Sequence, residues 1–301
     1  MFLSIIIPHK NDLDRLKRLV ATIPNEKEIE IIIVDDHSER EVFKNLIEEY
    51  VDQPNVSISA NDSKVFSAGK ARNIGLKEAI GEWIMFADAD DFFVEDWFAK
   101  VEKFKNSKED LIFFKPTSFD ERAKEQSNRH ILRERLINNY LANASIKNEM
   151  ELRSKFYEPW SKMIRHSLIK ENKIDFDETR YSNDQKFSTK IGILANQIYA
   201  SSEIIYCVVK STNSLTTQVT EESIITRFEV YTEVQKYLRA TLSKKKYRFA
   251  RGTTLYWYET GIRNRFSFKY FKMITNKTIK YKLPLRVGYY CWLVLTRKFT
   301  G

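Results

Sequence analysis

Residues 83–91, with the sequence WIMFADADD, join a wholly apolar run to three carboxylates within four residues. The apolar half is typical of a buried strand. Burying the unpaired carboxylates as well would be costly, so the strand has to end at an edge that solvent or a cation can reach. A divalent cation suits such a cluster, because Mg²⁺ binds one or two carboxylates together with phosphate oxygens. The alternative is an acidic turn that caps a helix starting near Asp96.

Short apolar runs alternate with amphipathic segments through the first half of the chain. The pattern predicts strands over 2–8, 30–34, 56–59, 83–87 and 111–114, with helices around 13–20, 42–47 and 71–80, the last closed by Gly81. Continuous apolar strands separated by helices predict an α/β fold with a mostly parallel sheet flanked by helices. Ligands bind at the carboxyl ends of such strands, so Asp35 and Asp36 would share one rim with Asp88, Asp90 and Asp91.

The second half of the chain gives weaker patterns. Residues 129–196 are mainly helical in pattern, 199–210 predict a pair of strands, and 221–242 predict a helix. The two cysteines, Cys207 and Cys291, are far apart and exclude a disulfide framework or a zinc site, which is typical of a cytoplasmic protein. The apolar N-terminus lacks a basic leader and is interrupted by Pro8, so it predicts a strand and not a signal peptide.

Positive charge is concentrated near the C-terminus. Residues 236–301 contain 17 Lys and Arg but one acid, Glu259, in a chain of net charge +9. Aromatic residues lie between these bases, and the apolar run 287–295 is well short of the ~20 residues that span a bilayer. This composition predicts peripheral association with an anionic membrane surface. A solvated tail, an oligomer contact and nucleic-acid binding are the alternatives, and no nucleic-acid-binding motif supports the last.

The glycine-rich loops that commonly cradle phosphates are missing. Neither G-x-G-x-x-G nor G-x-x-x-x-G-K-[ST] occurs, and the chain has only eight glycines. A Rossmann dehydrogenase and a P-loop ATPase are therefore disfavoured. A nucleoside diphosphate could instead be held by a metal ion on carboxylates, with Arg or Lys nearby.

Four motifs occur in order: SIIIPHKN (4–11), IIIVDDHS (31–38), GKARNIG (69–75) and GEWIMFADADD (81–91). Together they resemble the family 2 glycosyltransferases of the GT-A (Rossmann-like) fold, especially bacterial enzymes that make capsule, lipopolysaccharide or other surface polysaccharides. The resemblance is strong over about residues 1–115 and looser over 155–217. It implies a GT-A domain over 1–217, with a nucleotide-sugar half (1–115) and an acceptor half (116–217). A helical, basic, aromatic-rich region (218–301) would follow.

The resemblance implies a donor site for a nucleotide sugar, with UDP as the expected nucleotide. Asp36, together with Asp35, would read the base; the alternative is that they cap the helix over 39–50, which Ser38 could cap equally well. Asp88 and Asp90 match the D-x-D motif and would bind Mn²⁺ or Mg²⁺, which neutralises charge on the departing diphosphate. The implied nucleotide-sugar-binding set is Pro8, Asn11, Asp35, Asp36, Lys70, Arg72, Asn73, Asp88, Ala89 and Asp90.

Two later segments resemble the acceptor-side motifs of the family. EPWSK (158–162) matches W-x-K, and SNDQKF (182–187) matches the E-D pair with Asn183 in place of the usual Glu. The resemblance implies that Asp184 is the general base that takes the proton of the acceptor hydroxyl, in a displacement that inverts the anomeric configuration. The alternative is that Asp184 only caps the helix that runs to residue 194. The implied contacts to acceptor or sugar are Asp91, Trp160 and Lys162.

The sequence thus predicts an inverting, metal-dependent glycosyltransferase of the hexosyltransferase type. It would extend a surface glycan, carried on a polyprenyl diphosphate, from the cytoplasmic face of the membrane. A sugar nucleotidyltransferase and a non-catalytic carbohydrate-binding protein on the same fold are the alternatives. The missing glycine-rich loop disfavours the first, and the intact Asp88, Asp90 and Asp184 disfavour the second. The sugar, the acceptor, the linkage and the oligomeric state stay open.

Overall fold

The structure is a computed structural model that describes residues 1–210 and 219–288. Its strands are β1 (Leu3–His9), β2 (Ile29–Asp35), β3 (Val56–Ala60), β4 (Trp83–Phe86), β5 (Phe92–Phe93), β6 (Leu111–Asp120), β7 (Glu125–Gln126), β8 (Lys162–Arg165) and β9 (Ile198–Lys210). Its helices are α1 (Leu13–Ala21), α2 (Arg40–Tyr50), α3 (Ala68–Glu78), α4 (Trp97–Glu102), α5 (Ile131–Ala142), α6 (Ile146–Lys155), α7 (His166–Glu171), α8 (Gln185–Leu194), α9 (Glu221–Thr241), α10 (Lys244–Ala250), α11 (Leu255–Arg263) and α12 (Phe268–Lys280).

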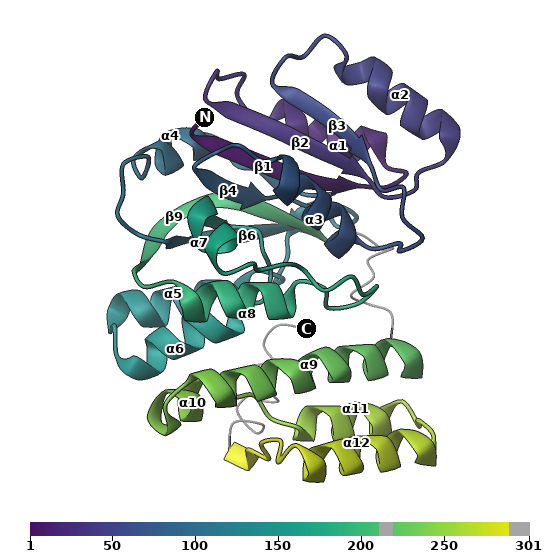
Figure 1. The fold of residues 1–301 in the computed structure, drawn as a ribbon, viewed down its shortest axis with the longest axis vertical. Coiled ribbons are helices and arrows are strands. Elements are labelled where there is room, and N and C mark those ends of the chain that lie inside the picture. The colour runs from purple at the N-terminus through teal and green to yellow at the C-terminus, as the bar shows by residue number, and fades with distance from the viewer. Residues whose placement is uncertain (211–218, 289–301) are drawn as a thin grey trace.

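The described strands form one sheet in the order β3-β2-β1-β4-β8-β6-β9-β5, with β7 paired to β6 (Figure 1). Around β1 the sheet is parallel, because β1 pairs in parallel with β2 and β4, and β2 pairs in parallel with β3. His9 lies opposite Asp35 in the register of β1 and β2, so these strands end at the same edge. This half confirms the α/β fold and the alternation of strands and helices that the sequence predicts.

The other half of the sheet is mixed, which corrects the expectation of a mostly parallel sheet. β8 lies antiparallel between β4 and β6, while β6 and β9 are parallel. The four residues of β8 belong to the region 129–196, whose sequence pattern predicted mainly helices, so this strand was not expected. The expected strand pair over 199–210 is also wrong: β9 is one long strand, whose register with β6 shifts between Phe113 and Pro116. Proline lacks the N–H that a regular ladder needs at such a point.

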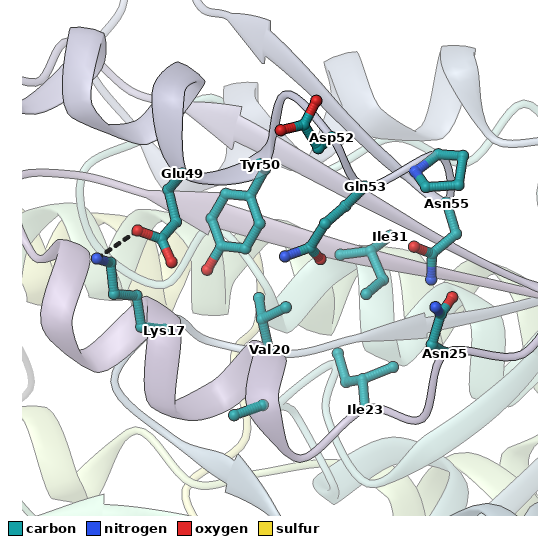
Figure 2. Close-up of a pocket in the computed structure, with 12 residues that line it drawn as sticks. Lys17, Val20, Ile23, Asn25, Ile31, Glu49, Tyr50, Asp52, Gln53 and Asn55 are labelled. Atoms are coloured by element: carbon teal, nitrogen blue, oxygen red, sulfur yellow. Dashed lines mark ion pairs between the residues drawn. The ribbon is translucent and has the colours of Figure 1, made fainter.

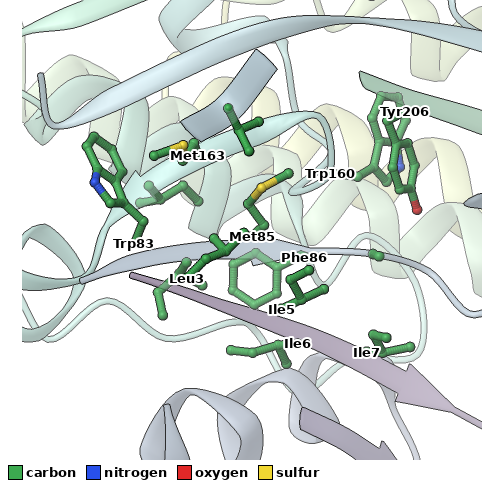
Figure 3. Close-up of a cluster of buried hydrophobic side chains, with 14 of the residues drawn as sticks. Leu3, Ile5, Ile6, Ile7, Trp83, Met85, Phe86, Trp160, Met163 and Tyr206 are labelled. Atoms are coloured by element: carbon green, nitrogen blue, oxygen red, sulfur yellow. The ribbon is translucent and has the colours of Figure 1, made fainter. Parts of the chain in front are cut away.

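The main core lies between the central strands and their neighbours. Figure 3 shows Ile5, Ile6 and Ile7 of β1 near Met85 and Phe86 of β4. All five side chains are fully buried, and each such burial contributes about 1.5–3 kcal/mol. β-branched residues fit these strands because both faces of the sheet are covered here.

Gly81 does not have the role that the sequence predicted for it. α3 ends at Glu78, and no described glycine has a positive φ, so Gly81 is not a left-handed helix cap. A Cβ at this position would clash with Ser4 on β1, whose Oγ accepts a hydrogen bond from the Gly81 N–H at 2.8 Å. Glycine is required here for close approach of two backbones.

The C-terminal helices form a layer beneath α6 and α8 in Figure 1. α9 confirms the predicted helix over 221–242 and is buried on two sides. Phe228 packs with Trp257 and Tyr270 of α11 and α12, while Val234 packs with Met150 of α6. Part of the aromatic content of the basic tail is therefore core and not surface.

Some predictions for the tail concern residues that the structure does not describe. Cys291 and most of the apolar run 287–295 lie outside the described residues, as do the bases Arg297 and Lys298. Within 1–210 and 219–288, no helix combines the length and the apolar character needed to cross a bilayer.

Candidate active site

A cavity of about 1070 Å³ opens at the carboxyl edge of the parallel strands. It is lined by residues from both predicted halves of the GT-A domain and from α9. Nine of the predicted site residues line it: Pro8, Asp36, Arg72, Asp88, Ala89, Asp90, Asp91, Trp160 and Asp184. Segments that are far apart in the sequence thus meet at the rim that parallel strands were expected to form.

The two neighbouring acids at the end of β2 have different surroundings. Asp36 lines the cavity, and its Oδ1 accepts a hydrogen bond from Asn61 Nδ2 at 2.7 Å. Asp35 lies outside the cavity lining, 3.1 Å from His9 Nδ1, and accepts the Ser38 N–H at 2.9 Å. Burial would raise the pKa of Asp35, but the hydrogen bonds from His9 and Ser38 outweigh it and lower the pKa. Neither acid caps α2, whose N-cap residue is Glu39.

Arg72 on α3 links the donor side of the cavity to the acceptor side. Only 5% of the residue is exposed. Its Nη2 donates to Asp88 Oδ1 at 2.5 Å, and its Nη1 donates to Asn183 Oδ1 at 3.0 Å. α3 can approach the segment that carries Asn183 because residue 69 is glycine, where a Cβ would clash with the Asp177 backbone. The guanidinium therefore joins the D-x-D motif to the residue that precedes Asp184.

Asp88 and Asp90 both line the cavity, and neither caps a helix. α4 begins later in the chain, after Asp96. Burial, together with the negative charge of Asp88, raises the pKa of Asp90 to about 6. Uncompensated negative charge of this kind fits a bound cation. No group of three or more His, Cys, Asp or Glu among the described residues is arranged to hold a metal, so diphosphate or water oxygens would have to complete its coordination.

Asp91 and Tyr206 hold the D-x-D loop against β9. Tyr206 is fully buried, and its hydroxyl accepts the Asp88 N–H at 2.8 Å. The hydroxyl also hydrogen-bonds the carboxyl group of Asp91, which accepts the Val209 N–H at 2.7 Å. Trp160 stacks on Tyr206, with ring centres 5.8 Å apart. These contacts fix the backbone of Asp88 at the cavity wall.

Asp184 occupies the N-cap position of α8, but its side chain makes no capping hydrogen bond. The carboxylate instead lines the cavity with Asn183 and Gln185. Burial raises the pKa of Asp184, and the positive charge of Arg72 partly offsets this. A carboxylate with a raised pKa at a cavity wall is a good candidate for a general base.

Lys162 lies behind the cavity and not in its wall. It is 2% exposed, and its Nζ donates to the backbone oxygens of Phe156 and Glu158, each at 2.6 Å. Burial holds the pKa of this ammonium well below its usual range. These bonds fix the loop that presents Glu158 and Trp160 to the cavity.

Three more predicted donor-site residues lie outside the cavity lining and join loops around it. The amide oxygen of Asn11 accepts the Glu39 N–H at 2.7 Å. Lys70 forms an ion pair with Glu178 at 3.0 Å. Asn73 exchanges two hydrogen bonds with the backbone of Phe176, at 3.0 and 2.8 Å.

The sequence did not single out several residues that line the cavity. Five of them are cationic: Lys10, Arg15, Arg129, Arg180 and Arg227. Arg227 belongs to α9, and its guanidinium lies 5.1 Å from the ring centre of Tyr181. A lone arginine on an amphipathic helix carries no signal of this position. Phe66 also lines the cavity, and its place in the polar loop NDSKVFS (61–67) was a signal.

A second cavity of about 490 Å³ lies between α1 and α2 and contains none of the predicted site residues (Figure 2). The ion pair of Lys17 with Glu49 lies at one side of it. Burial raises the pKa of the Tyr50 hydroxyl in its wall to about 12, so this group stays protonated at neutral pH. The cavity at the carboxyl edge is therefore the candidate active site.

Comparisons with known proteins agree with this geometry. The profile described as glycosyl transferase family 2 matches residues 4–172. The chain is 26% identical over 212 residues to the poly(ribitol-phosphate) beta-N-acetylglucosaminyltransferase TarS of Staphylococcus aureus. The aligned region covers 68% of this chain and 35% of TarS. It is also 26% identical over 212 residues to a poly(ribitol-phosphate) beta-glucosyltransferase of Bacillus spizizenii, covering 68% and 32%. The chain spans about a third of the length of these curated relatives.

Solved structures show the same fold. The crystal structure of S. aureus TarS 1–349 in complex with UDP-GlcNAc superposes with a TM-score of 0.71 at 20% identity, covering 93% of this chain and 80% of the other. A mannosyltransferase from Pyrobaculum calidifontis in complex with GDP-Man and Mn²⁺ gives a TM-score of 0.56 at 13% identity, covering 99% and 79%. The family profile extends over more than half of the chain, and the arrangement of strands is that of a GT-A fold. The chain belongs to glycosyl transferase family 2.

Proposed function

We propose that this chain is an inverting, metal-dependent glycosyltransferase that moves a sugar from a UDP-sugar to a hydroxyl of a surface glycan. The observation that carries the proposal is the meeting of Asp88, Asp90 and Asp184 in one cavity. One pair of carboxylates suits a metal-bound diphosphate, and the third suits a hydroxyl that has to lose a proton. UDP is the nucleotide in the solved complexes of S. aureus TarS, which supports the choice of donor.

The residues present fit a divalent cation. Asp88 and Asp90 would hold Mn²⁺ or Mg²⁺ together with the two phosphates of the donor, and the raised pKa of Asp90 marks the uncompensated charge. The ion would act as a Lewis acid toward the leaving diphosphate. Arg72 already binds Asp88 and lies at the same wall, where its guanidinium adds a second positive charge for the diphosphate.

In the proposed reaction one proton is removed from the acceptor and one leaving group departs from the donor. The acceptor oxygen forms a bond to the anomeric carbon as the bond from that carbon to the diphosphate oxygen breaks. Asp184 takes the proton of the acceptor hydroxyl, and UDP leaves with the bonding electron pair. Attack from the side opposite to the diphosphate inverts the anomeric configuration.

The acceptor that we propose is a glycan that carries phosphate groups. The two relatives from Staphylococcus and Bacillus are named for poly(ribitol-phosphate). Five cationic side chains besides Arg72 line the cavity here: Lys10, Arg15, Arg129, Arg180 and Arg227. Guanidinium groups suit phosphate because they donate two hydrogen bonds in a fixed fork.

We also propose that the C-terminal helices attach the protein to the cytoplasmic membrane face, where a lipid-linked acceptor would lie. On α12, Phe268 is 83% exposed and Ile279 is 70% exposed, and the lysines Lys269 and Lys272 of the same helix are also exposed. Such a mixture favours binding at an anionic lipid surface.

Replacing both lysines, as Lys269→Glu with Lys272→Glu, should reduce binding to vesicles with anionic lipid, because each base contributes about 1 kcal/mol near such a surface. Co-sedimentation measures this. Lys44→Glu with Lys77→Glu, on α2 and α3, is the control and should bind as the wild type does. Equal binding by all three proteins would reject this surface. Deleting 236–301 is a poorer test, because it would cut through α9 and expose its buried side chains.

The donor assignment predicts that UDP and one or more UDP-sugars raise the Tm of the protein only when Mn²⁺ or Mg²⁺ is present. Ligands that bind the folded state stabilise it in proportion to the logarithm of their concentration over Kd. A thermal-shift screen of nucleotide sugars, with and without metal, measures the effect. A shift for no uridine nucleotide, or an equal shift with a chelator present, would contradict the proposal.

A further inference from the structure

We propose that Phe66 stacks on the face of the donor base and contributes to the affinity of this site for the nucleotide. The inference rests on the proposed function, since it assumes a nucleotide donor. Phe66 is 57% exposed although it is a large aromatic side chain, and it lines the same cavity as Pro8 and Asp36. An exposed aromatic ring in a cavity that is otherwise rich in charge is a ready surface for a flat ligand.

The ring of Phe66 is held from behind. The imidazole of His37 lies 4.0 Å from it, centre to centre, with an angle of 35° between the planes. His37 has a left-handed backbone with φ of 62°, and its Nε2 hydrogen-bonds the Ser63 oxygen at 2.7 Å. One side of the Phe66 ring is therefore supported by a histidine that is itself anchored to the same loop.

Hydrogen bonds join Asp36, which would bind the edge of a base, to the loop that carries Phe66, which would stack on its face. Asn61 Nδ2 donates to Asp36 Oδ1 at 2.7 Å and to the Val65 oxygen at 2.8 Å. The loop that carries Phe66 is thereby tied to Asp36. The other carboxylate oxygen of Asp36 has no protein hydrogen bond among the described residues, so it is available to accept from a ring N–H of a base.

Lys10 is the other charged group at the ring. Its Nζ lies 5.2 Å from the ring centre of Phe66, and Lys10 lines the same cavity. The side chain is exposed and long, so an incoming base can take its place over the ring. The displaced ammonium would then be near the phosphates, where a point charge is useful.

This geometry makes Phe66 important for affinity and not for the chemical step. Removing an aromatic ring that stacks on a base weakens binding by roughly 5- to 150-fold. The base lies away from the anomeric carbon, so kcat at saturating donor should change little while KM for the donor rises.

The test measures binding of UDP and of inorganic pyrophosphate by calorimetry, both with Mn²⁺, for the full chain. Phe66→Ala should weaken UDP binding by about fivefold or more and leave pyrophosphate binding unchanged. Phe66→Trp should retain UDP binding, because it keeps an aromatic face. Val65→Ala is the matched control in the same loop, since Val65 lies outside the cavity lining, and it should bind UDP as the wild type does.

Three results would overturn the role of Phe66. The first is unchanged UDP affinity in Phe66→Ala, and the second is an equal loss for pyrophosphate, which would indicate general distortion of the site. A wild-type protein that binds pyrophosphate and UDP equally well would likewise exclude base stacking. Failure of the wild type to bind UDP at all would instead overturn the proposed function, so the two failures are distinguishable.

Discussion

Asp184→Asn should reduce transfer by about 10²- to 10⁴-fold and leave UDP binding intact. The substitution keeps the size of the side chain but removes the group that accepts the proton. Asp184 makes no capping hydrogen bond to α8, so the substitution removes no helix cap. The direct contacts of Arg72 are to Asp88 and Asn183, which the substitution leaves in place. Steady-state rates together with calorimetry of UDP binding measure the two effects separately.

Asp177→Asn is the matched control for this substitution. Asp177 belongs to the same segment, forms an ion pair with Lys186 at 2.7 Å, and lies outside the cavity lining. It should retain most of the transfer activity. Loss of UDP binding in Asp184→Asn would show that Asp184 belongs to the donor site and not to the acceptor side.

The rate of transfer should depend on pH through the protonation of Asp184. A general base works in its deprotonated form, so activity is present above its pKa and is lost as the pH falls through it. Burial raises the pKa of Asp184. The acidic limb of kcat should therefore lie above the value of about 3.9 that is usual for aspartate.

Asp90→Asn should abolish the dependence of UDP binding on Mn²⁺. A carboxylate that holds a divalent cation contributes charge as well as an oxygen, and an amide supplies only the oxygen. The apparent affinity for Mn²⁺ should fall by about 100-fold or more, since even residues that only support metal ligands contribute 10- to 100-fold. UDP titrations at several Mn²⁺ concentrations measure this.

Asp96→Asn is the control for that substitution. Asp96 is exposed, lies six residues further along the chain, and makes no capping hydrogen bond to α4. Its UDP binding should depend on Mn²⁺ as in the wild type. Wild-type behaviour in Asp90→Asn would place the metal elsewhere and would contradict the role assigned to the D-x-D motif.

The central strands were predictable because their signal is local. β1, β2 and β4 are continuous apolar runs, and parallel pairing follows from the helices between them. β8 was not predictable from such runs, because its four residues gain their place from pairing with β4 and β6 on both sides. α9 packs against α6 and α8, and a sequence pattern does not show which helices pack together.

The residues of the candidate site likewise include some that the sequence could locate and some that it could not. Asp88 and Asp90 follow directly from the end of a strand, so the sequence located them. Asp35 and Asp36 are adjacent and of one type, and only their contacts in the fold distinguish them. Asp35 contacts His9 and Ser38, whereas Asp36 contacts Asn61 and lines the cavity. Arg227 reaches the cavity from α9, and no local feature of the sequence indicates that position.

The most direct test of the proposed reaction follows the sugar by NMR in the presence of Mn²⁺, using the UDP-sugar that gives the largest thermal shift. The acceptors are a phosphate-bearing polyol polymer and a neutral oligosaccharide of similar length. The account predicts one UDP released for each glycosidic bond formed to the phosphate-bearing polymer, with an anomeric configuration opposite to that of the donor. Retention of configuration, or no transfer from any UDP-sugar to either acceptor, would contradict it.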